Sequence, residues 1–183
     1  MAPSSVVPFT TQCVQYEASD GYITSFVLNN ALYGKAKIFR KISRCPTEIE
    51  ICKILKEHPH PNCVMIYDVN GFCIDMEFLK TTFYETNNKK SILRDMRSAL
   101  DHLNGLGVVY VDLKLDNIGC ERRTYKLFDF DMSGIVKTSH QWYMEPTSGY
   151  VYRDYYKHVP KEDNKTLFDI DEYAFIKFEK ALF

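Results

Sequence analysis

The sequence predicts an α+β fold, and a helix followed by a hairpin carries this prediction. Apolar residues recur at three- and four-residue spacing over 91–106, which is typical of a helix with one buried face. A β-branched run at 108–111 follows, and a short polar turn then joins strands expected at 118–120 and 125–130. With 183 residues and 45% apolar content, the chain can bury the core of one domain.

Four polar side chains lie around this hairpin in a spacing that suits phosphoryl transfer. Asp112, Lys114 and Asn117 precede the first strand, and Asp129 ends the second. Phosphoryl transfer needs a carboxylate beside the attacking hydroxyl, a cation on the moving phosphate and oxygen ligands for Mg²⁺. An ordinary solvated turn also uses Asp and Asn, but the combined spacing favours the catalytic interpretation.

The stretch Asp112-x-Lys114-x-x-Asn117 with Asp129-Phe130-Asp131 resembles the catalytic loop and metal-binding motif of the protein kinase superfamily. The resemblance implies that Asp112 is the catalytic base and that Lys114 stabilises the transferred phosphoryl group. It also implies that Asn117 and Asp129 hold Mg²⁺. A Lys at position 114 is similar to the Ser/Thr-kinase pattern.

The same resemblance implies a bilobal fold within a single domain, 1–183. A small lobe with an antiparallel sheet and one helix is expected at about 10–78. A partial, mainly helical large lobe is expected at 79–183, ending near its central helix. The expected domain is compact and shortened at its C-terminus, and in this it resembles kinases found in large DNA viruses.

The segment 33–42 resembles the strand that carries the phosphate-binding lysine. Its three lysines, Lys35, Lys37 and Lys41, share one face because strand side chains alternate. Lys37 is followed by two apolar residues, as in the family, and it is 11 positions from Glu48. We therefore expect Lys37 to bind phosphate, with Lys41 as the alternative.

The segment 46–55 resembles the helix whose Glu pairs with that lysine, and the following His58-Pro-His-Pro-Asn62 resembles the family's turn into the next strand. Thr47 is expected to cap the helix. The positions +3, +4 and +7 from Glu48 are all apolar, whereas those from Glu50 are mostly polar. Glu48 is therefore expected to face inward.

Residues 71–79 resemble the last small-lobe strand and the hinge. By this resemblance Met76 is the gatekeeper, and the backbone from Glu77 to Leu79 receives adenine. The alternative is that residues 71–79 form an ordinary strand with no role in nucleotide binding.

The chain departs from the family pattern at three places. The segment expected to form the glycine-rich loop, 17–27, holds one glycine, which predicts a weak grip on nucleotide. Tyr110 and Val111 stand where the family has His-Arg, so we expect no control through activation-loop phosphorylation. Asp131 replaces the Gly of the metal motif.

The C-terminal part resembles the end of an activation segment at 147–154 and the central helix of the large lobe at 169–178. Asp169 is expected to brace the catalytic loop. The last 11 residues are rich in apolar and aromatic side chains. We expect them either to form an interface, with a second copy or another protein, or to bury against the helix at 91–106.

Composition excludes several other classes of protein. A net charge of −1 argues against a nucleic-acid-binding surface over the whole molecule. Six Cys with no C-x-x-C pair indicate reduced thiols in a cytoplasmic or nuclear protein, of a host cell if the source is viral. The N-terminus carries no signal for secretion or membrane insertion.

The expected function is therefore that of an ATP- and Mg²⁺-dependent Ser/Thr protein kinase with a protein substrate. Two alternatives remain open. One is a pseudokinase that binds and regulates a partner kinase. The other is a small-molecule kinase similar to aminoglycoside phosphotransferases.

Overall fold

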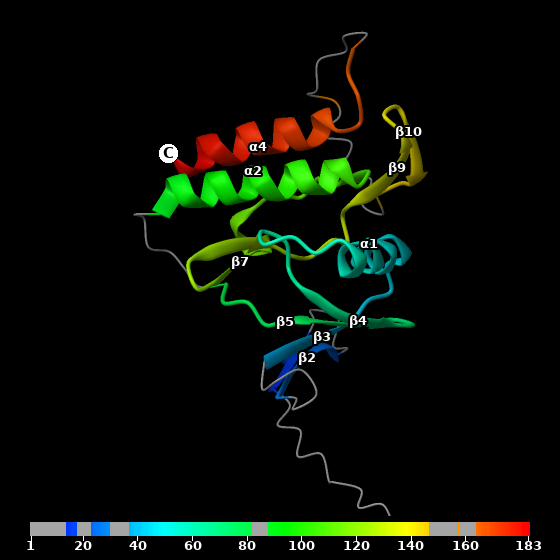
Figure 1. Ribbon diagram of the computed structural model, residues 1–183, viewed down its shortest axis with the longest axis vertical. Helices are drawn as coiled ribbons and strands as arrows, with labels where there is room; N and C mark the ends of the chain where they lie inside the picture. The colour runs from blue at the N-terminus through cyan, green and yellow to red at the C-terminus, as the bar shows by residue number, and fades with distance from the viewer. Residues whose placement is uncertain (1–13, 18–22, 30–36, 82–87, 147–156, 158–163) are drawn as a thin grey trace, which may run out of the picture.

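The computed structural model describes residues 14–17, 23–29, 37–81, 88–146, 157 and 164–183 (Figure 1). A sheet with one helix lies at one end of the molecule, and two long helices with two smaller sheets lie at the other. A single connection after Glu77 leads from the first part to the second. This arrangement confirms the predicted α+β fold with two lobes.

The small lobe is built on a five-stranded antiparallel sheet in the order β1-β2-β3-β5-β4. Its strands are β1 (Val14–Glu17), β2 (Ile23–Asn29), β3 (Lys37–Ile42), β4 (Ile66–Asn70) and β5 (Cys73–Glu77). The central strand β3 pairs with both β2 and β5, and Lys41 lies opposite Ser25 and Ile74. Pairing on both edges fixes the register of β3, and therefore the position of each of its side chains along the sheet.

Helix α1 (Pro46–Glu57) packs beside this sheet, and its N-cap lies two residues earlier than the sequence suggests. The thiol of Cys45, and not the expected Thr47, accepts the capping hydrogen bond from the N–H of Glu48. Pro46 occupies the first turn, where the absence of an N–H costs nothing. Only three residues separate β3 from α1, so the first turn of α1 is held against the end of β3.

Helix α2 (Lys89–Gly105) confirms the helix predicted from apolar spacing. The apolar residues on its inner face are all at most 4% exposed, namely Ile92, Met96, Ala99, Leu100 and Leu103. The carboxylate of Asp95 is also buried and accepts from the backbone N–H of Tyr125, which ties α2 to the hairpin that follows.

Two small sheets complete the large lobe. Strands β7 (Ile118–Glu121) and β8 (Thr124–Leu127) form the predicted hairpin, and the 3-10 turn η3 (Leu115–Asn117) leads into it. The other sheet has the order β10-β9-β6 and consists of β6 (Val108–Val109), β9 (Gly134–Thr138) and β10 (Gln141–Met144). Residues 110–117 and 128–133 therefore run between these two sheets.

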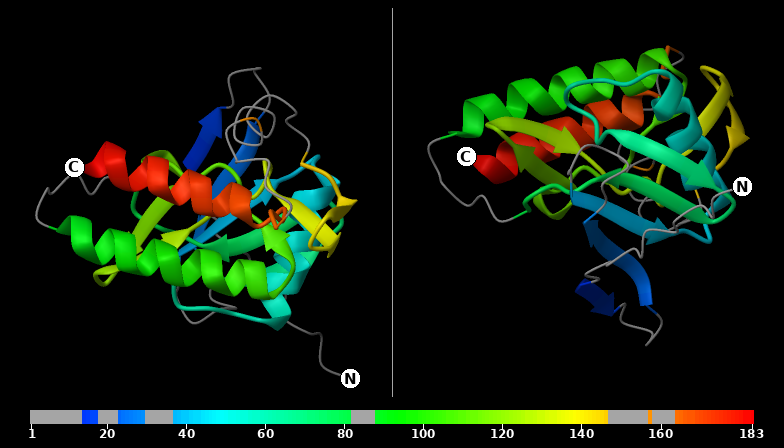
Figure 2. Two further views of the ribbon diagram at one scale, coloured as in Figure 1. Left: turned by 90° about the horizontal axis from the view of Figure 1, so that it is seen from above. Right: turned by 60° about the horizontal axis from the view of Figure 1, so that its bottom comes forward.

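Helix α4 (Asp169–Leu182) lies antiparallel beside α2 in all three views (Figures 1 and 2). Phe175 and Phe178 are buried, at 7% and 5% exposure, so part of this apolar surface packs within the chain, and the expected interface stays a prediction. Ile176 and Phe183 remain exposed. None of the helices in the described part of the chain is long and apolar enough to cross a membrane.

Candidate active site

Lys41 lies at the centre of a charged cluster between the two lobes. Its Nζ is 2.6 Å from Oε1 of Glu48 and 2.5 Å from Oδ1 of Asp129. Burial alone would lower the pKa of this ammonium group, but the charges of Glu48 and Asp129 outweigh that effect, and the pKa is raised. Lys41 therefore stays protonated and joins β3, α1 and the end of the hairpin region.

The expectation that Lys37 pairs with Glu48 is wrong. Lys37 begins β3 opposite Asn29, four residues before Lys41. Four residues of strand span about 13 Å, whereas the N-terminus of α1 adjoins the other end of β3. Lys41, the alternative from the sequence, makes the pair.

Glu48 faces inward, as its apolar neighbours on the helix predict, and it is 1% exposed. One oxygen accepts from the hydroxyl of Ser43 at 2.6 Å, and the other accepts from the N–H of Phe130 at 3.3 Å as well as from Lys41. The carboxylate is thus paired and hydrogen-bonded, which a buried charge requires. Glu50 lies on the surface and pairs with Lys53.

The second group of functional side chains comes from residues 112–117. Nζ of Lys114 is 2.7 Å from Oδ2 of Asp112, and this hydrogen bond raises the pKa of Lys114. The amide nitrogen of Asn117 donates to the backbone oxygen of Asp112 at 3.0 Å and to its Oδ2 at 3.1 Å. Asp112 is buried, and these two donors fix its orientation.

The two groups meet through the backbone of the hairpin. The N–H of Phe128 donates to the carbonyl of Asn117 at 3.1 Å, so Asn117 lies beside the segment that carries Asp129. Asp129 is one-third exposed, and its contact with Lys41 is made through the Oδ1 atom. The structure therefore brings together the predicted residues Asp112, Lys114, Asn117, Asp129 and Glu48, with Lys41 in the place expected for Lys37.

An amide oxygen from Asn117 and a carboxylate from Asp129 form a donor set that fits Mg²⁺. This hard cation prefers oxygen ligands, and in phosphate-handling sites it takes one or two from the protein and the others from phosphates and water. Among the described residues, no group of three or more His, Cys, Asp or Glu side chains is placed to hold a metal by itself. Such a pair would thus hold the ion together with a nucleotide.

The backbone between the two groups is held in an unusual conformation. Val111 has φ of +73° and Asp129 has φ of +63°. Asp tolerates this left-handed region, but a β-branched residue there is strained by roughly 1–2 kcal/mol. Such strain persists only where surrounding contacts impose it, and it concentrates at functional sites.

Asp171 on α4 supplies those contacts, and the expectation that Asp169 braces the catalytic loop is wrong. The Asp171 carboxylate accepts from the N–H of Tyr110 at 2.9 Å and of Val111 at 2.7 Å. Asp169 instead accepts from the backbone N–H and hydroxyl of Thr166 at the start of α4.

Tyr110 is a structural part of the site that sequence reasoning did not assign. Its hydroxyl donates to the carbonyl of Phe128 at 2.6 Å, and its ring meets that of Phe130 edge-on, with centroids 5.7 Å apart. Burial raises the pKa of Tyr110 well above its usual value. The hydroxyl of Ser133 donates to the Tyr110 carbonyl, so the loop is fixed from both sides.

Asp131 adds a further carboxylate near this cluster. Burial, followed by the charge of Asp129, raises its pKa above the usual value. Its backbone oxygen accepts from the Cys45 thiol at 3.5 Å, which links it to the N-terminus of α1.

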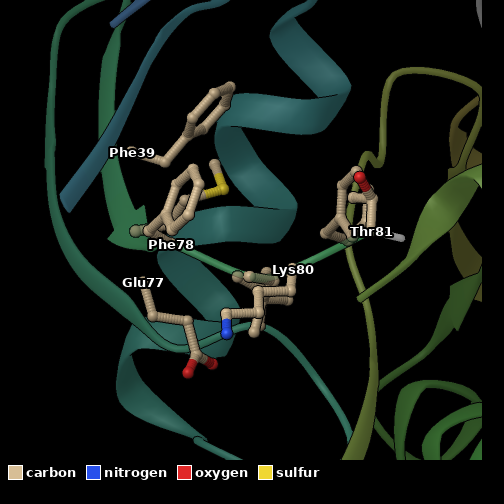
Figure 3. A pocket seen from close by; sticks show the side chains of 9 residues that line it. Phe39, Glu77, Phe78, Lys80 and Thr81 are labelled. Carbon is tan, nitrogen blue, oxygen red and sulfur yellow. The ribbon is translucent and has the colours of Figure 1, made fainter. Parts of the chain in front are cut away.

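A mostly apolar pocket of about 300 Å³ lies beside the cluster, where the lobes meet (Figure 3). Its lining includes the predicted gatekeeper and hinge, and consists of Phe39, Val64, Met76, Glu77, Phe78, Leu79, Lys80, Thr81 and Phe128. The rings of Phe39 and Phe78 lie close together in this pocket, and the carboxylate of Glu77 extends away from them. Phe39 precedes Lys41 by two residues on β3, so both project from the same face of the sheet.

The side chain of Glu77 holds the hinge in place, and its carboxylate is already bound by other residues of the chain. Its carboxylate is 2.7 Å from Nζ of Lys126 and accepts from the N–H of Met65, and its own N–H donates to the Met65 carbonyl. Leu79, two residues after Glu77 in the hinge, packs on Gly119. A Cβ added at Gly119 would lie 2.4 Å from the Leu79 Cβ. Adenine contacts by this hinge stay a prediction.

Two expected features lie at least partly outside the described residues. These are the segment 17–27, of which residues 18–22 are not described, and the activation-segment end at 147–154.

Comparison with known families agrees with this geometry. Residues 28–159, more than half of the chain, match the model of the protein kinase domain family. The chain belongs to the protein kinase family. The sequence resemblance drawn from the catalytic loop is thereby confirmed.

Similar curated proteins are Ser/Thr kinases at low identity. MAP kinase-interacting serine/threonine-protein kinase 1 of Xenopus tropicalis is 25% identical over 134 residues, which cover 68% of this chain and 32% of that protein. Serine/threonine-protein kinase PSK1 of Saccharomyces cerevisiae is 29% identical over 119 residues, covering 54% of this chain and 9% of that protein. The chain thus spans about a third or less of the length of these two relatives.

Proposed function

We propose that this protein is an ATP- and Mg²⁺-dependent Ser/Thr protein kinase that transfers the γ-phosphoryl group to a hydroxyl of a protein substrate. The observation that carries the proposal is the joining of two groups, Lys41–Glu48–Asp129 and Asp112–Lys114–Asn117, in one site. Each group supplies a part of the chemistry that phosphoryl transfer requires.

Lys41 is the residue proposed to position the nucleotide phosphates. Its ammonium group is held by two carboxylates and stays charged, so it offers a fixed positive charge at the edge of the apolar pocket. Pre-positioned charge of this kind contributes much of the rate enhancement in phosphoryl transfer. The pocket would receive the base, and Met76 and Leu79 would contact it from the hinge side.

Asp112 is proposed to orient the substrate hydroxyl and accept its proton. The amide of Asn117 holds the carboxylate from one side, and Lys114 contacts the same oxygen. Lys114 is half-exposed, so its side chain can turn from Asp112 toward a phosphoryl group, while the amide of Asn117 keeps its hydrogen bond to the buried carboxylate. Mg²⁺, when bound by Asn117 and Asp129, would neutralise charge on the phosphate oxygens.

The test is isothermal titration calorimetry with ATP, with and without Mg²⁺, on the wild type and on Asp129→Asn, followed by a transfer assay under the same conditions. We expect weak binding that requires Mg²⁺, with both binding and transfer reduced in Asp129→Asn. Absence of ATP binding at millimolar concentration would overturn the proposal. Binding without any transfer would favour the regulatory pseudokinase.

A further inference from the structure

A second cavity adjoins the catalytic loop on the side away from the small lobe. It has a volume of about 300 Å³ and lies between residues 113–116 and the C-terminal half of α4. Lys114 belongs to its lining and also contacts Asp112, so the cavity begins directly beside the proposed catalytic base. The cavity is therefore separated by one side chain, Lys114, from the carboxylate proposed to receive the substrate hydroxyl.

The walls of this cavity are apolar, and charged side chains lie at its rim. Phe178 is buried, whereas Leu115 is 37% exposed and Ala181 also lies on the surface, so the apolar lining opens to solvent. Lys177 provides a positive charge and Asp116 a negative charge at the rim, and Lys114 is already paired with Asp112. An apolar cavity of about 150 Å³ can hold a benzene ring, so this volume suits one large side chain and is too small for a second domain.

We propose that this cavity is a substrate-recognition subsite that takes one large apolar side chain, Phe or Leu, from a substrate segment. The proposal rests on the proposed kinase function, and it names the class of sequence that the site would select. An extended chain advances about 3.3–3.6 Å per residue. Because Lys114 lines the cavity and touches Asp112, the apolar side chain lies within a few positions of the Ser or Thr.

The experiment uses a series of labelled peptides, each with one central Ser in an Ala background. A Phe is placed in turn at each of the four positions before and after the Ser. Binding to the full chain is measured by fluorescence anisotropy, and phosphoryl transfer is measured in parallel. We expect one or two adjacent Phe positions to bind roughly tenfold or more tightly than the Ala peptide, as expected for burial of one large apolar side chain.

Two variants of α4 provide a matched pair. Ala181→Glu places a carboxylate in the cavity, and Ile176→Glu makes the same change of charge at an exposed position that does not line it. Ala181→Glu should abolish the preference for Phe, and Ile176→Glu should keep it.

Equal binding of Phe and Ala peptides at every position, or equal loss in both variants, would overturn the subsite. Self-association that Ala181→Glu removes, without any effect on peptides, would assign the cavity to a second copy of the chain and would also overturn it. If no peptide is phosphorylated but the positional binding and its loss in Ala181→Glu are found, the subsite stands and the proposed kinase function fails.

Discussion

The carboxylate of Asp171 lies 2.7 Å from the backbone nitrogen of Val111 and accepts its hydrogen bond. Val111 is the residue before Asp112, and its φ of +73° is a conformation that a β-branched residue adopts only under constraint. Helix α4 therefore controls the backbone that presents the proposed catalytic base, although none of its residues contacts Asp112 in the hydrogen bonds and ion pairs described above.

Asp171→Ala should destabilise the protein by roughly 2–5 kcal/mol, because two buried N–H groups lose their acceptor. Urea denaturation followed by circular dichroism measures this change. Asp169→Ala is the control: it removes contacts with Thr166 at the start of the helix and should cost only about 1 kcal/mol. An equal effect of the two substitutions would contradict the assigned role of Asp171.

Lys41→Met should weaken ATP binding by about tenfold or more, since a charge-assisted contact to phosphate is worth roughly 1.5–3 kcal/mol. Lys37→Met should bind ATP almost as the wild type does. Because Lys41→Met also leaves Glu48 buried and without its cation, it should lower stability by up to about 3–5 kcal/mol.

The double variant Lys41→Met with Glu48→Gln separates these two effects. It should recover much of the stability without recovering ATP affinity. If Lys37→Met, and not Lys41→Met, loses nucleotide binding in calorimetry, the assignment of Lys41 is incorrect.

Much of the site could be predicted from the sequence because local patterns carry the necessary information. The spacing of Asp112, Lys114, Asn117 and Asp129 is fixed by one hairpin, which a short polar turn reveals. The orientation of Glu48 follows from the apolar residues on its own helix face. Both are short-range properties of the chain.

The errors concern choices that depend on how elements dock. Lys37 and Lys41 occupy one face of β3, so alternation alone cannot separate them, and only the place where α1 adjoins the strand does. For α4, a usable signal was present. Positions +3, +4 and +7 from Asp171 are Ala174, Phe175 and Phe178, whereas Asp169 has Glu172 at +3. The criterion that identified Glu48 would have selected Asp171.

Gly119→Ala should destabilise the hinge, because the new Cβ would lie 2.4 Å from the Leu79 Cβ. Overpacking of this kind costs roughly 1–3 kcal/mol, and the displaced Leu79 should also weaken ATP binding. Gly105→Ala is the control, since no atom lies within 4 Å of its added Cβ and it ends α2. That substitution should be neutral or stabilise by up to about 1 kcal/mol. Thermal denaturation of both variants tests the prediction, and unchanged stability of Gly119→Ala would refute it.

Asp131→Asn should raise the melting temperature near neutral pH in the absence of nucleotide and Mg²⁺. The pKa of Asp131 is raised in the folded protein, so the folded state binds more protons than the unfolded state between the two pKa values. The stability associated with this group is therefore greatest at acidic pH and is lost as the pH rises through the folded pKa. The advantage of Asp131→Asn should be large at pH 7 and shrink toward pH 4, as differential scanning calorimetry can show. A constant difference across this range would argue against the raised pKa.

The most direct test of the proposed kinase activity is transfer of labelled γ-phosphate from ATP to a protein substrate by the wild type and by Asp112→Asn, with Mg²⁺ present and the labelled amino acid identified. Asp112→Asn preserves the shape of the side chain and removes the proton acceptor. We predict labelled Ser or Thr with the wild type and a loss of at least about 10²-fold in Asp112→Asn, with nearly unchanged ATP affinity. Equal transfer by the two proteins, or none by the wild type, would contradict the proposed function.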